Sequence, residues 1–459
     1  MNLLSRLLAI VFLAGLAAST THAGEKSDRH VIVISVDGLP AYLFADPNAS
    51  MRTIRELAEA GAVADGMTVS NPSVTWPNHT TLVTGVRPEK HGVIFNGMLE
   101  KSGPGLPINV NPHKEKSELV RVRTVFDVAH EQGLRTAGIN WPCTRNSGTL
   151  DVDFPDSPDT FKFSTPSFLD DLKLAGILTD EVIDNFSKYS VVRRDEVWTD
   201  AVCHVIRTQK PNLVLFHPLN LDAVHHRYGP QTWAGYSAVA CVDACIRRVL
   251  DAVDDAGIRE TTTVFVVSDH GFNAIPKTLN PNVILRQAGL LTVEANKVTT
   301  ARAHVFPEGG IGMLYLTVRE KRDEDRKKVI ELFSQLEGIE SIVLPEEFAK
   351  YGLPHPDEYE QMADLILVAK PGYGFAGTES GEDVVVTSTN VLGTHGFLST
   401  DPKMNATFIV SGAGIKPGIK LPVIDNIDVA PTVAHLLGLS LEGVDGRVLT
   451  EVLNEAGAK

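Results

Sequence analysis

Three continuous hydrophobic segments, all rich in β-branched residues, end close to acidic or imidazole side chains. The segments with their following residues are 30–36 with Asp37, 212–219 with Asp222, and 261–268 with Asp269 and His270. Such segments, without polar alternation, are typical of strands buried on both faces of a parallel sheet. Ligand sites in these sheets lie beyond the carboxyl ends of the strands, so residues remote in sequence converge there. We therefore predict an α/β protein whose functional site lies at the carboxyl edge of its sheet.

The side chains predicted to converge at this edge are carboxylates and imidazoles. They are Asp37, Asp222, His226, Asp269, His270 and His395. Mixed aspartate and histidine ligands suit a borderline divalent ion such as zinc. Asp222 and His226 lie four residues apart and can share one face of a helix, which suits joint ligation of one ion. The pattern indicates a metal-dependent hydrolase.

Residues 1–23 resemble a secretory signal peptide rather than part of the fold. Arg6 supplies a positive charge, the apolar segment 7–18 is too short to span a bilayer, and Thr21-His22-Ala23 resembles a cleavage site. No later segment is long and apolar enough to span a membrane. We expect an exported protein, periplasmic or secreted, without a membrane span after signal cleavage.

The charge balance bears on the class of partner. The chain has 42 Lys+Arg against 57 Asp+Glu, a formal net charge of −15. This argues against general nucleic-acid binding, which depends on basic side chains that neutralise phosphates. A small phosphate-containing substrate is still compatible with the acidic chain, because bound cations dominate the local field. The oligomeric state cannot be inferred from these features.

Four cysteines are compatible with an oxidising compartment. Cys241 and Cys245 lie one helical turn apart, so either could face Cys203 on a preceding helix. The alternative, which we favour, is that all four are small buried hydrophobic residues.

Strand and helix patterns alternate over much of the chain, which predicts a doubly wound, mostly parallel sheet sandwiched by helices. Helices are expected at 53–60, 122–131, 195–209, 234–256 and 430–437, and further strands at 135–140 and 406–411. Between 273 and 392 the pattern changes to a smaller α+β insertion. We predict a catalytic core made of 24–272 and 393–459, with 273–392 forming one wall of the cleft.

The segment from Ser73 to Gly85 carries a candidate nucleophile. Pro77 suits the first turn of a helix and places Thr75 near the cap position. A hydroxyl there lies at the positive end of the helix dipole, and a neighbouring divalent cation would allow Thr75 to ionise and attack. The alternative is an ordinary capping threonine, but the candidate metal ligands elsewhere favour the nucleophile.

Several segments, taken in order, resemble the alkaline phosphatase superfamily and specifically its nucleotide pyrophosphatase/phosphodiesterase (type I phosphodiesterase) branch. They are Val36-Asp37-Gly38, Thr75-Trp76-Pro77-Asn78-His79, 83–92, Asn96-Gly97-Met98, Asp222 to Pro230, Ser268-Asp269-His270-Gly271 and Gly393-Thr394-His395-Gly396. Each is weak alone, but the ordered set covers nearly the whole chain after residue 23.

The resemblance implies two Zn²⁺ ions per chain. Asp222, His226 and His395 would hold one. The other would be held by Asp37, Asp269, His270 and the Thr75 oxygen. In this family Thr75 would attack phosphorus in line to form a phospho-threonine ester, which water then hydrolyses. Asn96 corresponds to the residue that donates hydrogen bonds to a nonbridging phosphate oxygen.

The substrate is less constrained than the chemistry. Trp76 matches the position where nucleotide-cleaving relatives stack a base, with Phe161 or Phe163 as the loosely aligned second wall; equally, it could be a buried anchor for the loop. The chain shows no clear counterpart of the Arg and third metal site that help monoesterases hold a dianion, which favours diesters. His79, His91, His217 and His225 are predicted not to be ligands.

Three alternatives to a phosphodiesterase or nucleotide pyrophosphatase remain. One is a hydrolase of carbon–phosphorus bonds, similar to phosphonoacetate hydrolase, and another is a phosphomonoesterase of the same superfamily. The third is a zinc-dependent protein that binds nucleotides or lipid head groups without turnover, against which the presence of Thr75 argues. A sulfatase is disfavoured, because Cys143-Thr144-Arg145 has neither the proline nor the position of a sulfatase nucleophile.

Overall fold

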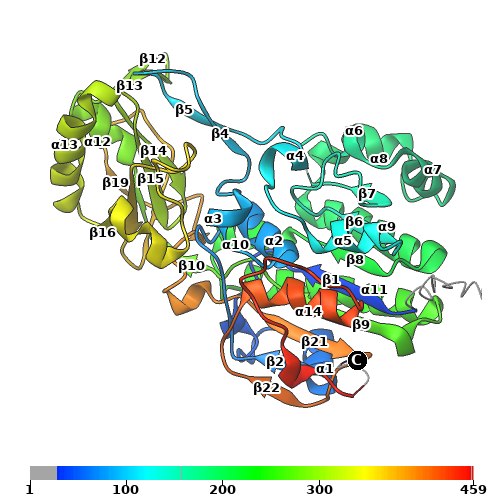
Figure 1. The fold of residues 1–459 in the computed structure, drawn as a ribbon. Coiled ribbons are helices and arrows are strands. Elements are labelled where there is room, and N and C mark those ends of the chain that lie inside the picture. The colour runs from blue at the N-terminus through cyan, green and yellow to red at the C-terminus, as the bar shows by residue number, and fades with distance from the viewer. Residues whose placement is uncertain (1–27, 157, 456, 458–459) are drawn as a thin grey trace, which may run out of the picture.

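An eight-stranded sheet runs through the larger part of the computed structural model (Figure 1), which describes residues 28–156, 158–455 and 457. The predicted signal peptide, 1–23, lies outside the described residues. In spatial order the strands are β22 (Ile419–Leu421), β2 (Ala62–Ala64), β21 (Phe408–Gly412), β9 (Thr262–Val267), β1 (His30–Ser35), β8 (Leu213–Phe216), β6 (Thr136–Ile139) and β7 (Val152–Phe154).

The strands from β9 to β7 are all parallel, which confirms the predicted fold class. Strand β21 runs antiparallel to both of its neighbours, β9 and β2. The segment 406–411 was predicted as a core strand, but its hydrophobic pattern does not specify its direction. The sheet is thus mostly parallel, with one reversed strand towards its β22 edge.

Helices cover both faces of the sheet because successive side chains of each strand point to opposite sides. In β1, Ile32 and Ile34 pack into one hydrophobic cluster and Val31 and Val33 into another. The first cluster is covered by α1 (Arg52–Ala60), α7 (Pro166–Leu174), α8 (Asp180–Asn185), α9 (Val191–Gln209) and α11 (Trp233–Asp255). The second is covered by α2 (Thr75–Thr84), α5 (Val125–Glu131) and α14 (Val429–Leu436).

Two predicted helix starts differ from the structure because of capping. Helix α9 begins at Val191, earlier than predicted, since the Ser190 side chain accepts a hydrogen bond from Arg193 N. Helix α5 begins at Val125, later than predicted, since Thr124 and Asp127 form a reciprocal capping box. Side-chain hydrogen bonds to the first-turn N–H groups set where these helices start.

A smaller lobe lies beside the sheet (upper left in Figure 1) and is joined to it by a two-stranded contact between β10 (Asn273–Ala274) and β20 (Gly393–Thr394). Its main sheet has the order β14 (Ala303–Glu308), β15 (Ile311–Leu316), β17 (Leu365–Ala369) and β16 (Ile339–Val343). Its other elements are β11 (Lys277–Leu279), β18 (Tyr373–Phe375), β19 (Val385–Thr387), β12 (Leu291–Glu294), β13 (Lys297–Ala301), α12 (Pro281–Gln287) and α13 (Arg322–Ser334).

The lobe also takes in a hairpin from the first part of the chain. Strands β4 (Met98–Lys101) and β5 (Ile108–Asn111) reach across to it (Figure 1). Leu99 and Ile108 share a buried cluster with Met313 and Ile366 of the lobe sheet. Residues 273–392 form strands and helices beside the main sheet, and the lobe's core also uses Leu99 and Ile108 from outside that range.

The remaining short elements connect these parts. They are β3 (Met67–Thr68), β23 (Ile424–Asp425), α3 (Pro88–His91), α4 (Lys116–Leu119), α6 (Thr160–Phe163) and α10 (Asn220–Tyr228). The four cysteines are free thiols. Cys143, Cys203 and Cys245 are buried, as favoured from the sequence, but Cys241 is exposed, so the prediction of four buried cysteines is wrong for that residue, which lies on the solvent side of α11. Among the described residues, no helix has the length and apolarity needed to cross a membrane.

Candidate metal centre and active site

The predicted ligands converge at the carboxyl ends of β1, β8 and β9. Asp37 lies two residues beyond the end of β1, and Asp269 and His270 follow the end of β9. Strand β8 leads into α10, which carries Asp222 and His226, both half-buried. Gly38, with φ 65°, turns the chain after β1 so that its N–H donates to Asp269 Oδ1 at 3.1 Å. The parallel order β9-β1-β8 therefore brings these residues together, as predicted.

Asp222, His226 and His395 form one cluster of potential ligand atoms. Their imidazole Nε2 atoms lie 3.3 Å (His226) and 3.7 Å (His395) from Asp222 Oδ1. The Nδ1 atoms lie 3.0 Å from main-chain carbonyls, His226 from Gly393 O and His395 from Ser73 O. A carbonyl can only accept, so Nδ1 carries the proton and Nε2 presents its lone pair towards Asp222. This geometry suits ligation of a cation.

Asp37, Asp269 and His270 form a second, fully buried cluster. His270 Nε2 lies 3.3 Å from Asp37 Oδ1 and 3.2 Å from Asp269 Oδ2. These three atoms have no hydrogen-bond partner, and neither has Asp222 Oδ1 in the first cluster. Buried polar atoms nearly always have a hydrogen-bond partner. Oxygen and nitrogen atoms that converge without one are suitable ligands for a divalent cation. The residues present therefore fit the two-metal expectation.

The two clusters are direct neighbours. The rings of His270 and His395, one from each cluster, stack with centroids 3.7 Å apart and an angle of 12° between planes. The Phe272 ring makes T-shaped contacts with His226 and His395, at 4.9 and 5.5 Å between centroids, and forms an apolar wall beside them. Adjacent centres of this kind suit a hydrolase that stabilises an attacking and a leaving oxygen together.

The carboxylates of the buried cluster compete for positive charge. Burial and the negative charge of Asp37 raise the pKa of Asp269 to about 7. Burial acts to raise the pKa of Asp37 as well, but the hydrogen bond from His217 and the positive charges of His217 and His270 hold it well below its usual range. Burial lowers the pKa of His270, whereas Asp269 and Asp37 outweigh burial and raise it to about 9. The negative charge of the cluster thus favours a bound cation, and without a metal ion the cluster holds a proton instead.

Thr75 is the first residue of α2, and Val74 occupies the cap position, so the predicted register is shifted by one residue. Pro77 lies in the first turn, as predicted, and Gly85 ends the helix with φ 68°. The segment before Thr75 touches the first cluster, since Ser73 O accepts from His395 Nδ1. Four residues after Thr75, His79 Nδ1 lies 2.9 Å from Thr75 O and 3.6 Å from Asp269 Oδ2 of the second cluster. The Thr75 hydroxyl therefore belongs to a helix start held between both clusters.

Asn96 is exposed and contacts the same helix start. Its Oδ1 accepts a hydrogen bond from Trp76 N at 2.8 Å. Since the amide oxygen already accepts this hydrogen bond, the Nδ2 group is the part of the side chain that can donate to another acceptor. The side chain is therefore oriented as a donor beside Thr75.

Trp76 is 5% exposed, so little of its ring is available for stacking. It packs with Val93, Leu119 and Cys143, and its Nε1 donates to Asp156 Oδ2 at 3.0 Å. Of the two interpretations left open by the sequence, this burial favours the loop anchor over the stacking wall.

The candidates for a second stacking wall have different surroundings. Phe161 packs towards the core, 5.7 Å from Phe154 and 5.1 Å from Phe186 between ring centroids. Phe163 is half-buried, and the guanidinium of Arg145 lies 5.7 Å from its ring and 6.0 Å from the Trp76 ring. Arg145 and Asp156 were not identified from the sequence, because they belong to no motif and come close to Trp76 only in the folded chain.

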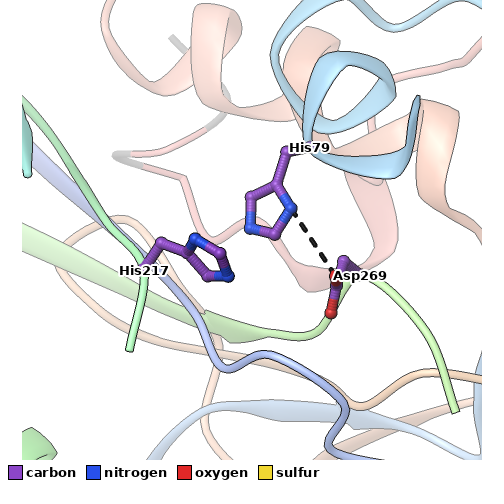
Figure 2. Close-up of side chains that lie close together, drawn as sticks. All are labelled: His79, His217 and Asp269. Carbon is purple, nitrogen blue, oxygen red and sulfur yellow. Dashed lines mark ion pairs between the residues drawn. The ribbon is translucent and has the colours of Figure 1, made fainter. Parts of the chain in front are cut away.

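The histidines that were predicted not to be ligands have separate environments. His225 is buried and packs edge-on against Phe272, whereas its neighbour His226 lies in the cluster. His91 is engaged on both ring nitrogens, by Thr81 Oγ1 at 3.1 Å and Val93 N at 3.1 Å. His79 and His217 lie close to Asp269 and form a third group with it (Figure 2).

Comparison with known proteins identifies one family. The family model described as type I phosphodiesterase / nucleotide pyrophosphatase matches residues 31–398. An uncharacterized pyrophosphatase/phosphodiesterase of Schizosaccharomyces pombe is 25% identical over 91% of this chain and 78% of its own length. Ectonucleotide pyrophosphatase/phosphodiesterase family member 7 of Mus musculus is 22% identical over 99% of this chain and 94% of its own length.

The fold is similar to that of solved structures with related names. Murine ectonucleotide pyrophosphatase/phosphodiesterase 5 superposes with a TM-score of 0.69 at 16% identity, covering 93% of this chain and 100% of the other. A structure of an inactive threonine-to-alanine variant of that murine protein, in complex with AMP, gives the same TM-score, identity and coverage.

Proposed function

Because the chain belongs to the type I phosphodiesterase / nucleotide pyrophosphatase family, a family of hydrolytic enzymes, we propose that it is an exported, two-zinc enzyme that cleaves phosphodiester or pyrophosphate bonds through Thr75. The observation that carries this proposal is the pair of ligand clusters, with four unpartnered buried atoms, on either side of the Thr75 helix start. Export is supported by the signal-like residues 1–23 and by relatives named ectonucleotide pyrophosphatase/phosphodiesterase.

The proposed ligands divide as the clusters do. Asp222, His226 and His395 would hold one zinc ion, and Asp37, Asp269, His270 and the Thr75 oxygen the other. When bound, the two cations would neutralise charge on the attacking and leaving oxygens. The main-chain carbonyls that fix the Nδ1 atoms of His226 and His395 hold these rings in place for that role.

Thr75 would carry the covalent chemistry. Its Oγ attacks phosphorus in line, the new oxygen–phosphorus bond forms, and the bond to the leaving oxygen breaks. The N-terminus of α2, where Thr75 is the first residue, stabilises the negative charge that develops there. Asn96, with its oxygen engaged by Trp76 N, donates from Nδ2 to a nonbridging phosphate oxygen. A water molecule then displaces Thr75, so the two inversions give net retention at phosphorus.

Nucleotides are the proposed substrate class. The support is the family description and the murine relative whose inactive threonine variant binds AMP. In this chain Trp76 is buried, so the base of the nucleotide would not stack on its ring. Phe163 is the aromatic side chain that we propose for base stacking instead. It is half-buried, and the Arg145 guanidinium lies beside its ring.

The test compares a nucleotide diester with a monoester. The zinc-loaded protein is expected to have a higher kcat/KM for p-nitrophenyl thymidine monophosphate than for p-nitrophenyl phosphate, and EDTA should abolish both activities. Thr75→Ala should lose turnover by several orders of magnitude while still binding AMP, because the nucleophile is removed while Asp37, Asp269 and His270 still offer three ligands to the second zinc ion. A preference for the monoester would refute the diesterase assignment. Activity on neither, with turnover of phosphonoacetate, would identify the carbon–phosphorus alternative.

A further inference from the structure

His217 is a fully buried imidazole that the proposed chemistry does not use. It follows the end of β8, and its Nε2 lies 3.1 Å from Asp37 Oδ2. The other oxygen of Asp37, Oδ1, is the one that faces His270 at 3.3 Å. The two oxygens of this carboxylate therefore have different neighbours: one contacts His217, and the other contacts the buried cluster.

His217 is itself held by a reciprocal pair of hydrogen bonds with Asn140. The ring Nδ1 lies 3.0 Å from Asn140 O, and Asn140 Nδ2 donates to His217 O at 2.7 Å. Asn140 has φ 57°, a left-handed conformation that asparagine tolerates better than most residues. Main-chain hydrogen bonds hold both residues against the sheet: His217 N donates to Ile139 O, and Asn140 N donates to Phe154 O. The position of the imidazole is thus set by the ends of three neighbouring strands.

Both ring nitrogens of His217 face acceptors. A main-chain carbonyl oxygen cannot donate, so Nδ1 donates to Asn140 O. Nε2 faces a carboxylate oxygen of Asp37 and donates to it. No lone pair of the ring is then available to a metal ion.

This decides between two interpretations of the group in Figure 2. His79, His217 and Asp269 bring potential ligand atoms within 4.8 Å of one another, as a third metal site would. However, His217 is engaged on both nitrogens, and His79 uses Nδ1 on Thr75 O at 2.9 Å. The two rings pack at 4.0 Å between centroids, and His79 also packs edge-on against Trp141. His79 Nε2 has no hydrogen-bond partner, but with both nitrogens of His217 engaged only His79 and Asp269 could offer a ligand atom. The trio is therefore a packed support for the buried cluster and not a third cation site.

We propose that His217 is a positioning residue for the metal centre: its hydrogen bond to Asp37 Oδ2 fixes the carboxylate so that Oδ1 is directed at the Asp37/Asp269/His270 cluster. Asn140 in turn fixes His217. The inference depends on the proposed role of Asp37 as a ligand. Partners that orient a metal ligand typically contribute 10- to 100-fold in metal affinity, and that is the scale expected here.

The experiment measures zinc affinity and not only activity. His217→Phe keeps a ring of similar size but removes both donors, whereas His217→Gln keeps one amide donor. His304→Phe is the matched control, because His304 is also buried but lies in β14 of the smaller lobe, where its Nδ1 accepts from Ile108 N at 3.2 Å. Each full-length protein is stripped of metal and titrated with zinc against a chromophoric chelator. Circular dichroism of the metal-free proteins checks that the variants fold.

We expect one of the two zinc ions to bind about 10- to 100-fold more weakly in His217→Phe, with the other nearly unchanged. His217→Gln should recover part of the loss, and His304→Phe should match the wild type. Equal zinc affinities in His217→Phe and the wild type would overturn this inference and leave the proposed function standing. A wild-type protein that binds no zinc would instead overturn the proposed function, and this inference with it. If His217→Phe does not fold, the same titration of His217→Gln and Asn140→Ala decides the question. Asn140→Ala removes the hydrogen bond from Asn140 Nδ2 to His217 O.

Discussion

The two ends of the Asn96 amide are predicted to have separable roles. Oδ1 accepts from Trp76 N at 2.8 Å, and Nδ2 is the proposed donor to the phosphate. Asn96→Ala removes both, whereas Asn96→Asp keeps an acceptor for Trp76 N but replaces the donor with a negative charge. The comparison therefore distinguishes a structural contact from a contribution to the reaction.

The expected magnitudes differ in the same way. Loss of one oxyanion donor typically lowers kcat by roughly 10²- to 10³-fold, or about 2.7–4 kcal/mol, and both variants should show at least this loss. Loss of the hydrogen bond to Trp76 N should lower stability by only about 0.5–1.5 kcal/mol, because the Asn96 side chain is exposed. This second loss is expected in Asn96→Ala alone, since an aspartate near the first turn of α2 is favourable with the helix dipole.

The assay is kcat and KM with p-nitrophenyl thymidine monophosphate, together with Tm of the zinc-loaded proteins. An Asn96→Asp variant with wild-type kcat would show that Asn96 Nδ2 does not act as a donor in the reaction. Equal proportional losses of activity and thermal stability in both variants would show that the side chain only holds the loop.

Two further predictions concern protons and Trp76. Zinc binding should release protons at pH 7: burial lowers the pKa of His270, but Asp269 and Asp37 raise it to about 9, so its folded-state proton must leave before a cation binds. Apparent zinc affinity should thus rise with pH up to about 9 and fall on acidification; calorimetric heats that do not depend on the ionisation enthalpy of the buffer would contradict this. Trp76→Phe should lower stability by about 1.5–3 kcal/mol, because the bond from Nε1 to Asp156 is lost, while KM for the nucleotide diester changes less than about threefold, as a buried anchor requires. A Tm equal to that of the wild type, combined with a large rise in KM, would restore the stacking role.

The central strands were predictable because their signal is local. In β1, β8 and β9 an unbroken hydrophobic segment is enough to indicate burial on both faces. The direction of β21 was not predictable, since a hydrophobic segment reads the same in either orientation and its antiparallel pairing depends on the path of the chain between 393 and 408. The β4–β5 hairpin was likewise missed as part of the smaller lobe, because Leu99 and Ile108 find their partners in Met313 and Ile366, more than 200 residues away.

Residue types alone indicated a metal-binding hydrolase, because aspartates and histidines placed just after buried strands have few other uses at that edge. The sequence by itself thus determined the central strands and the family, and it supplied the proposal of a metal-ligand set. Tertiary structure decided which atoms of those residues converge, that Trp76 is buried against Asp156, and that the Asn140–His217 pair stands behind Asp37. The physical reason is the range of the interactions: hydrophobic periodicity acts over a few neighbouring residues, whereas hydrogen bonds such as that from His217 to Asp37 join positions that only the folded sheet brings together.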